Sequence, residues 1–142
     1  MLKLGIAGNP VFHSKSTVLF QLLAKKYSLQ LQYLPISTPN CKSIIDFSNY
    51  INLDGFNITT PLKQSIMELL PKIDYQASNL NSVNTVLKNN NSMVGYNTDY
   101  FGILQTIWNK KLIFNKKKVV ILGSGSAART AAFAIRNLNA KI

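Results

Sequence analysis

The sequence predicts an α/β fold in which a mostly parallel sheet is the middle layer of a three-layer α/β/α arrangement. Short apolar runs of strand type alternate along the chain with longer segments whose apolar residues have helical spacing. Four polar segments, moreover, come directly after predicted strands. Open α/β sheets bind ligands at the carboxyl ends of their strands, so the same pattern also predicts where a binding site should lie.

The first third of the chain alternates strand and helix twice. Residues 3–8 form a short apolar run that is closed by a Gly-Asn-Pro turn. Ser16 or Thr17 can cap a helix that runs to about Tyr27. The elements expected next are a strand at 31–36, a helix at 42–50 and a strand at 54–58.

The middle of the chain continues with a helix, a hairpin and another helix. Pro61 suits the first turn of a helix whose apolar face is supplied by residues between 66 and 70. Residues 74–81 make a short helix or a loop. The elements expected after them are a strand at 83–87, an Asn-rich turn at 89–91, a returning strand at 93–96, a helix at 98–108 and a basic segment at 110–118.

A glycine-rich loop marks the last part of the chain. Residues 119–122 read as a buried strand, and a helix is expected from about Ser126 to Leu138. Between them Gly123-Ser124-Gly125-Ser126-Ala127-Ala128 fits the dinucleotide-binding pattern G-x-G-x-x-A. Gly123 permits the tight turn and Gly125 lets the backbone approach a pyrophosphate, while the helix N-terminus offers free N–H groups. A plain strand–turn–helix corner made of small residues is the alternative.

Three further segments have the polar side chains needed for chemistry at a strand end. Residues 55–63 place Lys63 beside a helix start, where a cation is electrostatically disfavoured, so function is one reason to keep it there. In residues 95–99, Thr98 or Asp99 would make a good N-cap. Residues 8–16 form a polar loop that includes His13. Solvated lysine, helix capping and simple turn chemistry are the structural alternatives for these three segments.

Composition excludes several classes of protein. The chain has 142 residues, a formal net charge of +11 and 46% hydrophobic residues, which argues against intrinsic disorder. No apolar run is long enough for a transmembrane helix or a signal peptide. With one cysteine, Cys41, and one histidine, we predict neither a disulfide nor a metal site. The lysines are dispersed and no reader motif is present, so we predict no nucleic-acid partner. We also expect no membrane partner and a cytoplasmic protein.

Five segments together resemble shikimate dehydrogenase. They are GNPVFHSKS (8–16), NITTPLK (57–63), SVNT (82–85), GYNTD (95–99) and GSGSAAR (123–129), and they occur in the order and spacing of that family. The resemblance implies a shikimate-binding and catalytic domain over residues 1–108. It also implies that residues 109–142 are the beginning of an NADP-binding Rossmann domain, truncated after its first β–loop–α unit.

The resemblance also implies roles for individual residues. Ser14 and Ser16 would bind shikimate, and Thr59, Asn84 and Asp99 would contact its ring hydroxyls. Lys63 would share substrate binding and form the catalytic pair with Asp99 in the reversible, NADP-linked reduction of 3-dehydroshikimate to shikimate. Hydride addition to a ketone builds negative charge on oxygen, which a lysine can stabilise and protonate. The cofactor would be held by Gly123, Ser124, Gly125, Ser126, Ala127 and Arg129, in a monomer or homodimer.

The sequence departs from the family pattern at three places. Thr17 stands where proline is usual, Asn81-Ser82 stands where Gly-Ala is common, and Ser126 replaces a third glycine. None of these departures removes an expected functional side chain. A truncated, non-catalytic shikimate-binding module is the alternative to an enzyme.

Overall fold

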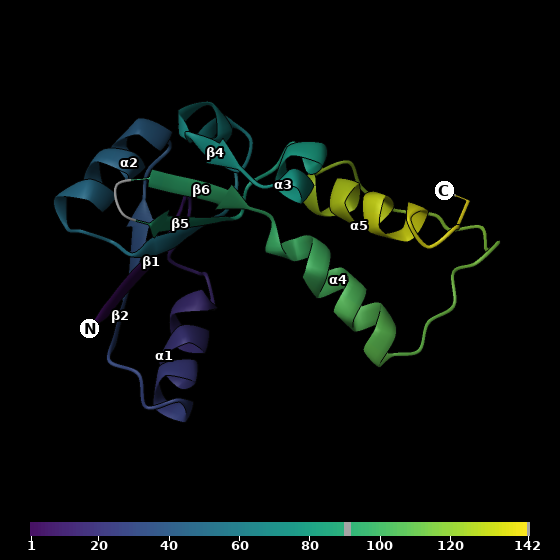
Figure 1. Ribbon diagram of the computed structural model, residues 1–142, viewed down its shortest axis with the longest axis horizontal. Coiled ribbons are helices and arrows are strands. Elements are labelled where there is room, and N and C mark those ends of the chain that lie inside the picture. Colours follow the sequence, from purple (N-terminus) through teal and green to yellow (C-terminus); the bar gives the residue numbers. More distant parts are fainter. Residues whose placement is uncertain (90–91, 142) are drawn as a thin grey trace.

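The computed structural model describes residues 1–89 and 92–141, and in these residues six strands form one sheet of order β2-β1-β3-β5-β6-β4 (Figure 1). Strand β1 is parallel to both β2 and β3, β4 is parallel to β6, and only β5 runs antiparallel to its neighbours. The predicted mostly parallel sheet and the predicted β5–β6 hairpin are therefore confirmed. The strands are Leu2–Gly8 (β1), Leu31–Ser37 (β2), Gly55–Ile58 (β3), Lys72–Ile73 (β4), Thr85–Asn89 (β5) and Ser92–Tyr96 (β6).

The expected turn at 89–91 falls at positions 90 and 91 outside the described residues. Strand β4 has no counterpart in the prediction, because two residues are too few to produce a strand pattern. The helices are Ser16–Lys26 (α1), Cys41–Tyr50 (α2), the 3₁₀-helix Ser65–Leu69 (η1), Tyr75–Leu80 (α3), Thr98–Asn109 (α4) and Ser126–Arg136 (α5). Within the described part of the chain, none of these helices has the length and apolar character needed to cross a membrane.

Two hydrophobic clusters cover opposite faces of the sheet. Side chains alternate along β1, so Ala7 joins a cluster with Ile44 of α2 and Ile66 of η1, whereas Ile6 packs with Tyr33 and the partly buried Phe20 of α1. The first cluster is much the larger, and α1 has no buried residue. Helices therefore lie on both faces, and the core is concentrated on the side of α2 and η1.

The segment after Pro61 is a turn followed by a 3₁₀-helix, so the helix predicted here begins only at Ser65 and is of 3₁₀ type. The carbonyl of Lys63 accepts a hydrogen bond from the N–H of Val83 at 2.8 Å. The N–H of Met67 consequently bonds to the carbonyl of Gln64, three residues back, at 3.0 Å. A tertiary contact to the chain before β5 thus competes with the α-helical hydrogen bond at this position.

Residues 119–122 do not form the predicted buried strand. In the described part of the chain, the pairing here is a single parallel bridge between Lys118 and Lys141. Val120 and Leu122 are 83% and 94% exposed. An apolar run becomes a buried strand only when neighbouring strands satisfy its backbone hydrogen bonds and cover its side chains. The residue after the bridge partner Lys141, Ile142, lies outside the described residues. The bridge is nevertheless parallel and follows α5, as at the start of a βαβ crossover.

Candidate active site

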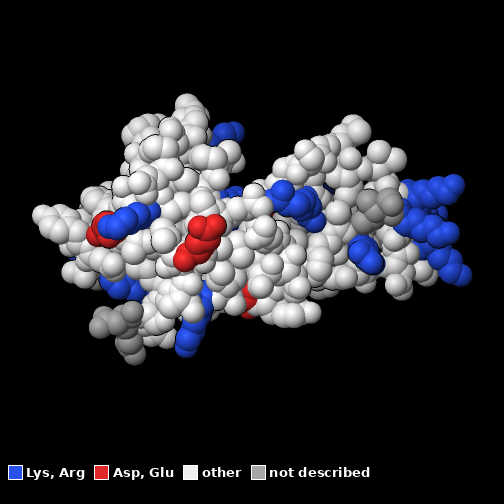
Figure 2. Space-filling view, turned by 90° about the horizontal axis from the view of Figure 1, so that it is seen from above, with Lys and Arg blue, Asp and Glu red and all other residues white. Residues whose placement is uncertain are grey.

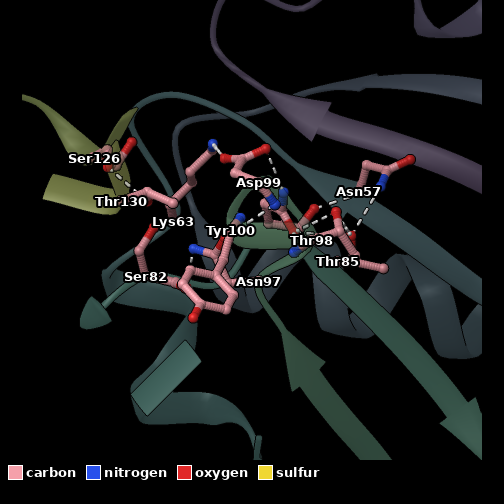
Figure 3. A network of polar contacts seen from close by, with 11 residues as sticks. Asn57, Lys63, Ser82, Thr85, Asn97, Thr98, Asp99, Tyr100, Ser126 and Thr130 are labelled. Atoms are coloured by element: carbon pink, nitrogen blue, oxygen red, sulfur yellow. Dashed lines mark hydrogen bonds and ion pairs between the residues drawn. The ribbon is translucent and has the colours of Figure 1, made fainter. Parts of the chain in front are cut away.

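The site is built around an ion pair at the edge where β3 and β6 end. The ammonium Nζ of Lys63 lies 2.7 Å from Oδ2 of Asp99, and the amide Nδ2 of Asn84 donates to the other carboxylate oxygen, Oδ1, at 2.7 Å (Figure 3). The side chain of Lys63 is 18% exposed and that of Asp99 is 37% exposed. The pair is therefore partly shielded from water but still accessible to a small molecule.

Helix α4 begins in a way that leaves the carboxylate of Asp99 free for this contact. Asn97 is the N-cap, and its Oδ1 accepts hydrogen bonds from the N–H groups of Asp99 and Tyr100 at 3.1 and 3.4 Å. Asn97 is also only 1% exposed, and its Nδ2 donates to the carbonyl of Ser82. Capping by Thr98 or Asp99 is therefore a wrong prediction: the extended backbone needed at an N-cap occurs one residue earlier.

The first loop brings Ser14 and Ser16 together. The hydroxyl of Ser14 donates to the hydroxyl of Ser16 at 3.0 Å and accepts the N–H of Ser16 at 3.2 Å. Helix α1 starts at Ser16, and its N-cap, Lys15, makes no side-chain cap bond, so neither Ser16 nor Thr17 caps the helix. The hydroxyl of Ser14 accepts a hydrogen bond from the N–H of Ser16 at the start of the helix, and this bond takes the place of the expected cap by Ser16 or Thr17.

Close packing joins this loop to the end of β3. A Cβ placed on Gly8 would collide with Cγ2 of Thr59, so only glycine permits this approach. The N–H of Thr59 bonds to the carbonyl of Ala7, and the N–H of Asn9 bonds to the carbonyl of Thr60. Thr59 is thereby held beside the loop that carries the two serines.

The glycine loop lies on the other side of Lys63. A cavity of about 280 Å³ is lined by Lys63 and Gln64 together with Gly125, Ser126 and Arg129. Gly123 has a φ of +130°, a conformation that favours glycine, and both Gly123 and Ser124 are exposed just before α5. A second cavity, of about 510 Å³ between α4 and α5, is lined by residues that include Asp99 and Ala127.

These cavities place the start of α5 beside the ion pair. Gly125 caps α5 without a side chain, so the first N–H groups of the helix can receive an anionic group. The chemistry of the loop therefore fits the phosphates of a dinucleotide. Lys63 and the start of α5 therefore border the same cavity.

Several polar residues that the prediction omits complete the site. The carbonyl oxygen of the Asn84 side chain accepts hydrogen bonds from the hydroxyl of Thr85 and from both the N–H and the hydroxyl of Thr98, at 2.9, 2.9 and 3.2 Å. Asn57 donates to Thr85 at 3.2 Å. Their positions in the sequence could have identified them: Asn57, Thr85 and Thr98 all lie at or beside strand ends, within the segments already selected from the sequence.

Comparison with known proteins identifies the family of this chain. The family model described as "Shikimate dehydrogenase substrate binding domain" matches residues 6–86. The chain belongs to this family. Shikimate dehydrogenase (NADP(+)) of Methanococcus maripaludis is 35% identical over 138 residues, which cover 96% of this chain and 50% of that relative. The resemblance recognised in the sequence is thus confirmed.

Solved shikimate dehydrogenases also share the fold. The enzyme from Aquifex aeolicus superimposes with a TM-score of 0.91 at 32% identity, over 99% of this chain and 54% of that one. The enzyme from Thermus thermophilus, solved in complex with NADP(H) and shikimate, gives a TM-score of 0.88 at 28% identity, with the same coverage. The chain therefore spans about half the length of the relatives that it matches.

Proposed function

We propose that this chain is the substrate-binding and catalytic part of an NADP-linked shikimate dehydrogenase, which interconverts 3-dehydroshikimate and shikimate. The observation that carries the proposal is the contact of Lys63, Asp99 and Asn84 within segments characteristic of the family. One cation, one carboxylate and one amide converge where parallel strands end. This set suits a substrate with several hydroxyls and a ketone, because these groups offer both donors and acceptors.

The ion pair performs the acid–base part of the proposed reaction. When a hydride adds to the ketone carbon, the electron pair of the C=O π bond moves onto oxygen. The ammonium of Lys63 stabilises this developing charge and transfers a proton to the oxygen, giving the alcohol. Asp99 holds the ammonium in place through its Oδ2. In the reverse direction, the neutral amine of Lys63 removes the hydroxyl proton as the hydride leaves.

The remaining expected site residues belong to the first loop and to segments at neighbouring strand ends. Ser14 and Ser16 bind shikimate from the first loop, and Thr59 and Asn84 contact its ring hydroxyls. The closeness of the Ser14–Ser16 loop to Thr59, through the contact with Gly8, supports this grouping. Residues 1–108 then form the shikimate-binding domain.

The last part of the chain supplies the start of the cofactor site. NADP, when bound, provides or accepts the hydride. Gly125, Ser126 and Arg129 face Lys63 across one cavity, and Ala127 lines the other. We assign residues 109–142 to the beginning of the dinucleotide-binding domain. Within it, the loop residues that approach the phosphates are Gly123, Ser124, Gly125, Ser126, Ala127 and Arg129.

Calorimetric titration of this chain with shikimate tests the proposal. The unaltered chain is expected to bind, and Lys63→Ala should weaken binding by about tenfold or more, since a charged hydrogen bond contributes roughly 1.5–3 kcal/mol. Lys88→Ala is the matched control, because Lys88 bonds to Asn49 away from the site. An unaltered chain that gives no heat with shikimate would contradict the proposal.

Adding NADP⁺ together with shikimate tests whether this chain is catalytic on its own, and reduction of NADP⁺ would exclude a non-catalytic module. Shikimate binding without any reduction of NADP⁺ by this chain fits a non-catalytic module or a part that needs the rest of the enzyme. In a full-length enzyme that contains this chain, Lys63→Ala should reduce kcat far more than it raises KM. A kcat that survives this substitution would remove the proposed role of Lys63.

A further inference from the structure

A continuous series of hydrogen bonds leads from the second strand to the ion pair. The hydroxyl of Tyr33 donates to Oδ1 of Asn57 at 2.8 Å, and Nδ2 of Asn57 donates to the hydroxyl of Thr85 at 3.2 Å. Thr85 in turn donates to Oδ1 of Asn84 at 2.9 Å, and Nδ2 of Asn84 donates to Asp99. Figure 3 shows the part of this series from Asn57 and Thr85 to Asp99 and Lys63.

Each member of the series restricts the next because donors and acceptors must alternate. A phenol has a single O–H donor. When Tyr33 donates its hydrogen bond to Asn57, the Asn57 amide must present its oxygen to Tyr33 and its NH₂ to Thr85. Thr85 then accepts from Asn57, and its single proton is directed to Asn84. With its oxygen occupied by donors, Asn84 turns its NH₂ toward the carboxylate of Asp99.

The Asn57 amide is the point at which this order can reverse. If its oxygen faced Thr85, that hydroxyl could donate to Asn57 and would no longer donate to Asn84. Thr98 also donates to the oxygen of Asn84, through both its N–H and its hydroxyl, so the amide would keep two of its three donors. The expected consequence of a reversal is therefore a weaker orientation of Asn84 and not its loss.

Tyr33 is well placed to determine the direction of the series. Its ring is stacked on Phe20 of α1, with centroids 4.4 Å apart and an interplanar angle of 15°, and the residue is 7% exposed. Burial raises the pKa of Tyr33 to about 12, although the side chain of Ser16 beside it opposes the rise. The phenol consequently remains a donor throughout the physiological range and lies next to the loop expected to bind shikimate.

We infer that Tyr33 and Asn57 are positioning residues, which act through Thr85 to orient the Asn84 amide and thereby link the Ser14–Ser16 loop to the Lys63–Asp99 pair. The inference rests on the proposed function for its effect on shikimate binding. Its effect on the orientation of the two amides does not depend on any ligand.

The test follows the side-chain NH₂ signals of Asn57 and Asn84 in ¹⁵N-resolved NMR spectra of this chain, without ligand and during titration with shikimate. Tyr33→Phe removes the first donor and keeps the ring that stacks on Phe20. Thr85→Val interrupts the series at its centre, and Thr85→Ser keeps the hydroxyl. Tyr27→Phe is the matched control, because Tyr27 is 60% exposed and lies outside the series.

Tyr33→Phe and Thr85→Val are each expected to move the Asn84 signals and to weaken shikimate binding by about 2- to 10-fold, the range for one neutral hydrogen bond. Thr85→Ser and Tyr27→Phe should leave both properties near those of the unaltered chain. Because Tyr33 and Thr85 act in one series, the double variant Tyr33→Phe/Thr85→Val should bind shikimate about as tightly as the weaker-binding of the two single variants.

Asn84 signals that do not respond to Tyr33→Phe would overturn the inference, and so would additive effects in the double variant. If Tyr33→Phe does not fold, the contrast between Thr85→Val and Thr85→Ser decides the matter by the same signals. If the unaltered chain does not bind shikimate, the proposed function fails, while the ligand-free Asn84 signals still support or overturn the positioning series.

Discussion

Lys63 lies in a turn, and its nearest carboxylate belongs to a residue 36 positions further along the chain. Sequence patterns single out Lys63 because a cation is disfavoured at a helix start. The structure replaces that helix start with a turn and adds Asp99 as the compensating charge. Lys63 is thus compensated by Asp99, which is close in the folded structure but distant in the sequence.

Two of the departures from the family pattern have different consequences in the structure. Asn81, where glycine is common, ends α3 with a φ of 47°, a left-handed conformation that asparagine tolerates better than most residues. Ser82, where alanine is common, is fully buried, and its Oγ has no hydrogen-bond partner among the described residues. The first substitution is compatible with the backbone, whereas the second places an unsatisfied polar atom in the core.

We therefore expect Ser82→Ala to raise the free energy of unfolding by about 1 kcal/mol, since a buried hydroxyl without a partner costs roughly 1–3 kcal/mol. Urea unfolding followed by circular dichroism measures the change. The matched control is Ser48→Ala, at an equally buried serine whose hydroxyl donates to the carbonyl of Ile45 at 3.1 Å. That variant should lose stability, and equal signs for the two substitutions would contradict the explanation.

Among the helices, α4 is the element that determines the site. Its N-cap, Asn97, satisfies two helical N–H groups and also bonds to the chain just before β5. Its first turn thereby places Asp99 toward Lys63 and its N-terminal dipole near the carboxylate. Along its length, Tyr100 packs against Phe133 of α5, with ring centroids 5.6 Å apart. One helix thus connects the ion pair to α5.

Asn97→Ala should therefore destabilise the protein by about 2–3 kcal/mol, because it removes a cap and leaves the carbonyl of Ser82 without its donor. Asn40→Ala is the control: Asn40 caps α2 through one bond to the N–H of Lys42 in an exposed position and should cost about 1 kcal/mol. Urea unfolding compares the two variants. An effect at Asn97 no larger than that at Asn40 would show that the bond to Ser82 contributes nothing.

Across the whole molecule, charge is divided unevenly. Residues 100–142 carry eight of the 16 lysines and arginines and none of the five acidic residues. Figure 2 shows Lys and Arg gathered at one end of the molecule, and the acidic side chains visible in that view lie away from this end. This excess of positive charge favours the approach of an anionic ligand to the basic end of the molecule.

The chain between α4 and α5 also differs from the rest of the molecule. Residues 110–118 include five exposed lysines and contain no helix or strand in the described chain beyond the bridge at Lys118. Limited digestion with trypsin should therefore cut first in this segment. Mass spectrometry of early products should reveal a fragment ending at 110–118 before any cut at Lys72 or Lys88, which lie in strands. An early cut within the sheet would contradict the assigned division near residue 108.

The mostly parallel sheet and, apart from β4 and the strand expected at 119–122, the order of strands and helices were predictable from the sequence. These features depend on local properties, namely the period of apolar residues and the turn residues at strand ends. The hairpin of β5 and β6 and the helices α1, α2, α4 and α5 lie close to where local patterns put them. The roles of the individual site residues remain proposals.

Tertiary structure alone decided the features that depend on partners distant in the sequence. The N–H of Val83 bonds to the carbonyl of Lys63, and the helix expected after Pro61 is a turn and a 3₁₀-helix. Among the described residues, the apolar run at 119–122 has no neighbouring strands that would make it a buried strand. The convergence of Lys63, Asn84 and Asp99 likewise requires three strand ends to meet at one edge. Hydrogen bonds between distant segments compete with local secondary-structure preferences. A local sequence pattern does not indicate which of these long-range bonds will form.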